Sequence, residues 1–94
     1  MLYLLSYDLI KPEKDYVDLI AYLKKIGGKK VLLSEWLVTS ALTSKALCDA
    51  VHLNGKMDAN DQILVLEACN NAIWRPKLDI TDAEAIAMFK TARC

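Results

Sequence analysis

The sequence lacks the cysteine and charge patterns that assign many small proteins to a class. It has three cysteines, which is an odd number, and no two of them form a CxxC pair. This pattern argues against a disulfide framework and a zinc site, and it fits a protein of the reducing cytoplasm. Twelve basic and twelve acidic side chains cancel. No overall field therefore draws the chain to nucleic acid or to an anionic bilayer.

A long uninterrupted apolar run is also missing. The N-terminal apolar segment is broken by Asp8, so it is too short to cross a membrane, and it lacks the basic region of a signal peptide. With 54% hydrophobic and 26% charged residues among 94, the composition is typical of a soluble globular protein and not of a disordered tail or a collagen. We expect one domain, residues 1–94, with no membrane partner.

What is present is a succession of apolar segments with strand and helix periodicity. Residues 2–10 are apolar on both sides of the pleat apart from Ser6 and Asp8, which predicts a central strand covered on both faces. The elements expected after it are a helix within 11–28 that stops at Gly27 and Gly28, a hairpin or bulged strand within 29–40, a helix over 43–55 and a strand within 60–70.

A final helix is predicted over about residues 81–92. Thr81 followed three residues later by Glu84 is a capping-box pattern. We expect this helix to pack through Ile86 and Phe89, with Met88 as a further contact.

The resulting order, β-α-β-β-α-β plus a C-terminal helix, predicts an α+β fold of the ferredoxin-like type with an antiparallel sheet. In that arrangement helices cover one face of the sheet, and the other face is left to water or to a partner. An apolar uncovered face on a chain of this size predicts a homodimer.

Four segments carry a resemblance to a known family. They are the strand end "SYDL", the hairpin "LLSEWLV", the strand "NDQILVLEA" and the tail "NNAIWRP". Together they resemble the SinR-like branch of the CRISPR-associated protein two superfamily, which also includes the virulence-associated protein D toxins. The resemblance covers about the first three-quarters of the chain, as far as Pro76, and it is one of pattern and order.

The resemblance implies a ferredoxin-like subunit that forms a homodimer by sheet-to-sheet contact. In nuclease members of the family, the aspartate that ends the first strand faces its symmetry mate across the dimer groove, where the two can hold a divalent metal. Asp8 matches that position, which implies a Mg²⁺-dependent endoribonuclease with Asp8 as catalytic and metal-binding residue. Other members bind nucleic acid without cutting it, and SinR-like proteins have no established activity.

Asp8 also has a structural interpretation. Aspartate often closes a strand by accepting hydrogen bonds from backbone amides two residues on, and Pro12 follows shortly. The residue is therefore either a hard oxygen ligand for a cation or the first residue of an Asx-turn.

Contacts to RNA or DNA would have to come from a local patch. Ser34 and Trp36 are candidates for a phosphate hydrogen bond and a stacking surface, and the one dense basic cluster consists of Lys24, Lys25, Lys29 and Lys30. The alternatives are that Trp36 belongs to the core or a dimer contact, and that the lysines balance a helix dipole at a solvated end.

Two further patterns are weaker. Cys48 and His52 lie four residues apart on a predicted helix, but no third ligand or orienting group accompanies them. "MDAND" lacks the glycine and glutamate of a calcium loop. The sequence thus leaves two hypotheses, a metal-dependent endoribonuclease and a non-catalytic dimeric module, such as an antitoxin, immunity or assembly protein, that binds a protein partner.

Overall fold

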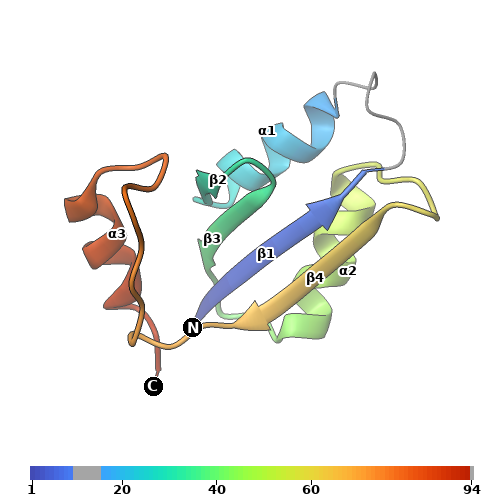
Figure 1. The fold of residues 1–94 in the computed structure, drawn as a ribbon. Helices are drawn as coiled ribbons and strands as arrows, with labels where there is room; N and C mark the ends of the chain where they lie inside the picture. Colours follow the sequence, from blue (N-terminus) through green and yellow to red (C-terminus); the bar gives the residue numbers. More distant parts are fainter. Residues whose placement is uncertain (10–15, 94) are drawn as a thin grey trace.

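The chain folds into a four-stranded antiparallel sheet with helices on both faces, an α+β arrangement. The computed structural model describes residues 1–9 and 16–93. Within these ranges the elements are β1 (Leu2–Asp8), α1 (Val17–Lys25), β2 (Lys29–Leu32), β3 (Glu35–Thr39), α2 (Ser44–Asn54), β4 (Gln62–Glu67) and α3 (Asp82–Phe89), as Figure 1 shows. The predicted order of elements is confirmed. The expected strand end at Ile10 and the turn before Pro12 lie outside the described residues.

The strands lie in the order β2-β3-β1-β4, and each neighbouring pair is antiparallel. β1 and β2 are therefore parallel to each other with β3 between them, and β3 and β4 are parallel with β1 between them. β2 and β3 form the predicted hairpin, with a register shift between Lys30 and Leu32. The central position of β1 explains why its sequence is apolar on both sides of the pleat.

The larger core lies between the sheet and the helices α1 and α2. Alternate strand residues such as Tyr3 and Leu5 point to this side and meet Leu19, Leu23 and Leu47 of the helices. Figure 1 shows α2 behind β4, and α1 contacts α2. The helices therefore bury the odd-numbered side of β1.

A smaller core lies on the opposite face of the sheet. Leu2, Val31 and Leu37 are buried there against α3 and the segment that precedes it, through Leu78, Met88 and Phe89 among others. The expectation that helices cover only one face is wrong for the part of the sheet near β2 and β3. The part near β4 stays open, with Leu64 58% and Leu66 41% exposed.

Helix α1 ends as its glycines predict. Gly27 has φ +84°, a conformation that disfavours every side chain with a Cβ. Its N–H donates to the Lys24 carbonyl at 3.1 Å, and the Gly28 N–H donates to the Leu23 carbonyl at 2.8 Å. These two bonds are those of the Schellman motif, and they turn the chain directly into β2.

Helix α3 begins with the predicted capping box. The Thr81 hydroxyl accepts from the Glu84 N–H at 3.1 Å, and the Glu84 carboxylate accepts from the Thr81 N–H at 3.2 Å. Met88 and Phe89 pack on the sheet as expected. The prediction for Ile86 is wrong, because its side chain is 51% exposed and Ala85 is the buried residue of this helix. A small residue at that position lets the helix approach the sheet closely.

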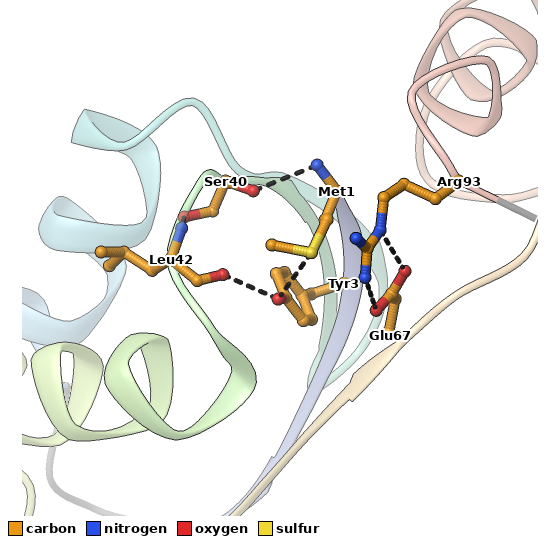
Figure 2. A network of polar contacts seen from close by, with 6 residues as sticks. All are labelled: Met1, Tyr3, Ser40, Leu42, Glu67 and Arg93. Carbon is orange, nitrogen blue, oxygen red and sulfur yellow. Dashed lines mark hydrogen bonds and ion pairs between the residues drawn. The ribbon is translucent and has the colours of Figure 1, made fainter.

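One end of the sheet is tied together by polar contacts, which Figure 2 shows. The Met1 amino group donates to the Ser40 carbonyl at 3.1 Å, and the Tyr3 hydroxyl donates to the Leu42 carbonyl at 2.7 Å. Arg93 donates through Nε and Nη2 to the two carboxylate oxygens of Glu67, both at 3.1 Å. Since β1 starts at this end, Asp8 lies at the other.

Candidate functional site at the end of the central strand

Asp8 ends β1 on the open side of the sheet. In the register of β1 with β4 it lies opposite Gln62, and Ser6 lies opposite Leu64. These residues line a shallow hollow of about 220 Å³. Asp8 is exposed, and within residues 1–9 and 16–93 no hydrogen bond or ion pair engages its carboxylate.

Glu35 is a second carboxylate at this end, and it was missed by reasoning from the sequence. It lies opposite Ser6 in the register of β1 with β3, so it is the diagonal neighbour of Asp8 on the same face. Diagonal neighbours in an antiparallel pair have Cα atoms about 7–8 Å apart, which long side chains can bridge. Glu35 is half-buried and Asp8 is exposed, and the two line different hollows of the same face.

Ser34 lies beside Tyr7, the residue that precedes Asp8 in β1. Its backbone carbonyl accepts from the Tyr7 N–H at 3.1 Å, which fixes the β2-β3 turn beside the last residues of β1. Its half-buried side chain remains a candidate to donate to a phosphate.

The lysines gather elsewhere. Lys24, Lys29 and Lys30 line a hollow of about 360 Å³ between the end of α1 and β2. Lys29 is also 3.7 Å from Glu84. Lys25 is exposed in the same last turn of α1 but does not line the hollow. The cluster is therefore a local basic patch, and it also neutralises the negative end of the α1 dipole.

The structure does not join this patch to Asp8. β3 separates β2 from β1, so the strands carrying Lys30 and Asp8 lie about 10 Å apart across the sheet. Lys30 pairs with Trp36, whose side chain points to the α1 side, whereas Asp8 belongs to the opposite face. A nucleic acid that contacted both would have to pass over the β2 edge.

Trp36 is a core residue, and the prediction that it offers a stacking surface is corrected. It is 2% exposed, and its Nε1 donates to the Tyr7 hydroxyl at 3.4 Å. A base cannot reach either face of a ring that is packed among buried side chains. Side chains alternate along β3, and this places Trp36 on the same side of the sheet as Val38, which is fully buried.

The cysteines do not form a catalytic group in the described part of the chain. Burial raises the pKa of the Cys48 thiol, which disfavours the thiolate that a nucleophile needs. Cys69 is disulfide-bonded. A disulfide at Cys69 does not fit the expected reducing compartment, so the assignment to the cytoplasm loses the support of the cysteine pattern.

Asp61, at the mouth of β4, is a buried carboxylate with a structural role. It accepts from the Tyr16 hydroxyl at 3.0 Å and from the Asp58 N–H at 2.8 Å. These bonds tie the segment before β4 to the start of α1. Over residues 1–9 and 16–93, no group of three or more histidine, cysteine, aspartate or glutamate side chains is placed to hold a metal ion.

Comparison of the chain with protein-family models, with curated proteins and with solved structures found no match. The resemblance drawn from the four sequence segments therefore stays a prediction. Among the described residues, no helix has the length and apolar composition that crossing a bilayer requires.

Proposed function

We propose that the chain is a ferredoxin-like, homodimeric, metal-dependent endoribonuclease with Asp8 as its central ligand. The order β2-β3-β1-β4, with α1 and α2 each connecting two parallel strands on either side of a third, supports the ferredoxin-like assignment. The observation that carries the activity is the exposed Asp8 carboxylate, which no described residue engages, beside a second carboxylate on the same face.

The proposed site is built within one chain. Asp8 and Glu35 supply carboxylate oxygens from neighbouring strands, and the side-chain amide of Gln62 supplies a third oxygen from β4. Hard oxygen donors of this kind suit Mg²⁺ or Mn²⁺. A divalent cation bound there would activate water toward the phosphodiester of RNA. Ser34 would hold a non-bridging phosphate oxygen, and the patch of Lys24, Lys29 and Lys30 would contact the backbone further along.

The test is calorimetric titration with Mn²⁺, followed by RNA cleavage assays with and without the ion. We expect Asp8→Asn to keep the fold and to lose both metal binding and metal-dependent cleavage, because the amide keeps the shape but removes the charge. Asp18→Asn is the matched control, since Asp18 is an exposed aspartate on α1 that lies 3.6 Å from Lys56. Cleavage that persists in Asp8→Asn would exclude Asp8 from catalysis.

A non-catalytic dimeric binding module is the second candidate. The observation in its favour is that the described residues place only two carboxylates, and no third acidic, histidine or cysteine ligand, at the end of β1. If the wild-type chain binds no Mn²⁺ and cleaves no RNA, this interpretation replaces the first. The exposed apolar part of the sheet would then be its binding surface for a protein partner.

A further inference from the structure

The two edges of the sheet differ in how they are protected. The β2 edge is short, carries Lys29 and Lys30 and has a register shift, all of which discourage pairing with another strand. The β4 edge runs over Gln62–Glu67 and has no charge, proline or described bulge between its two ends. Its interior sequence, ILVL, is apolar.

The backbone of β4 shows which groups are open. The Ala68 N–H donates to the Leu2 carbonyl at 2.8 Å, and in an antiparallel ladder every second residue bonds to the same neighbour. The even-numbered residues of β4 therefore bond to β1, and Ile63, Val65 and Glu67 direct their N–H and C=O groups to the outer edge. No described segment pairs with β4 on that side.

We propose that this edge pairs with the β4 edge of a second copy, antiparallel and about a two-fold axis at Val65. In that register Val65 lies opposite the partner's Val65, and Ile63 lies opposite the partner's Glu67. Every outward N–H and C=O of the strand then has a partner. A second copy fits because the pattern of open groups is its own complement under the two-fold rotation.

The side chains agree with the same register. On the open face, Leu64 lies opposite the partner's Leu66 and Leu66 opposite the partner's Leu64, so exposed leucines cover one another. Glu67, which faces the partner's Ile63, already has its charge satisfied by Arg93 at 3.1 Å. No like charges meet along the pair.

This inference specifies the interface of the proposed homodimer and does not depend on the nuclease activity. It also differs from the sheet-to-sheet contact that the family resemblance implies. The two β1 strands lie three strand spacings apart in the paired sheet, about 14 Å or more. In this dimer the two Asp8 residues are too far apart to share one cation.

The experiment combines sedimentation with hydrogen exchange of individual amides. We expect the wild-type chain to sediment at twice 10.5 kDa, with the Val65 and Ile63 amides protected from exchange. Leu64→Lys should sediment as a monomer and lose that protection, because a lysine would face Leu66 in each of the two apolar pairs. Leu53→Lys is the control, since Leu53 is 76% exposed on α2 and should stay a dimer.

Three outcomes would overturn the pairing. If the wild-type chain is a monomer at all concentrations, the β4 edge does not pair with a second copy. It would then be open to an extended peptide of a different protein. A dimer that survives Leu64→Lys would show that its interface lies elsewhere. A dimer with freely exchanging Val65 and Ile63 amides would show that the sheets stack by their faces. Circular dichroism of each variant separates loss of pairing from loss of folding, and none of these readouts uses the nuclease activity.

Discussion

Replacing Gly28 by alanine should destabilise the fold because the added Cβ clashes with neighbouring atoms, and not because the backbone conformation disfavours a side chain. A Cβ at this position would lie 2.8 Å from the Leu23 carbonyl oxygen, 3.2 Å from Cε3 of Trp36 and 3.3 Å from Cγ2 of Val38. The carbonyl belongs to the last turn of α1, and both side chains are buried, so none of the three can move freely. Overpacking of this kind typically costs about 1–3 kcal/mol.

Gly27 provides the contrasting case. A Cβ there meets nothing within 4 Å, but the residue has φ +84°, and the left-handed conformation costs an alanine about 1–2 kcal/mol. Asparagine tolerates that conformation better. Gly27→Asn should therefore recover part of the stability lost in Gly27→Ala, whereas Gly28→Asn should be at least as unstable as Gly28→Ala.

The assay is thermal unfolding followed by circular dichroism. For a chain of this size each kcal/mol lowers the melting temperature by about 4–8 °C, so Gly28→Ala should melt at least about 4 °C below the wild type. A Gly28→Ala variant that melts at the wild-type temperature would refute the steric argument. Equal melting temperatures of Gly27→Asn and Gly28→Asn would show that both positions act through backbone conformation alone.

Two further predictions concern the C-terminal part of the fold. Thr81→Ala removes the capping hydroxyl of α3 and should cost about 1 kcal/mol, measured as a lower midpoint in urea. Hydrogen bonds from the backbone N–H and hydroxyl of Thr81 lower the pKa of Glu84, and the hydrogen bond from Arg93 lowers that of Glu67. A lowered folded-state pKa gives stability that is present above the unfolded value of about 4.3 and is lost as the pH falls through the folded value. The melting temperature should therefore drop on acidification. A Glu67→Gln, Glu84→Gln double variant should show a shallower drop. If its melting temperature depends on pH as the wild type's does, the assignment of this stability to Glu67 and Glu84 is wrong.

Features set by local chemistry could be predicted from the sequence. Thr81 and Glu84 determine the start of α3 through bonds between residues three apart, and Gly27 ends α1 because of its own conformational freedom. Both signals operate within one helical turn. The order of the elements followed from the same kind of local pattern.

Features set by strand pairing could not be predicted in the same way. Glu35 is a neighbour of Asp8 only because β3 pairs with β1 in a register that places it opposite Ser6. The lysines of β2 are separated from Asp8 because β3 lies between β2 and β1, and Trp36 is buried because its alternate position faces α1. Each of these outcomes depends on which residue lies opposite which, and periodicity along one chain does not contain that information.

The central strand serves two cores at once, and this shapes how the molecule can open. Leu2 belongs to the smaller core and Tyr3 and Leu5 to the larger one, so β1 cannot be released without disrupting both. Helix α3, in contrast, contacts the smaller core alone. The C-terminal layer can therefore detach in a partial unfolding event while the sheet, α1 and α2 stay intact. The proposed carboxylate site and the β4 edge both belong to the part that would persist, but the edge would lose the ion pair between Arg93 and Glu67.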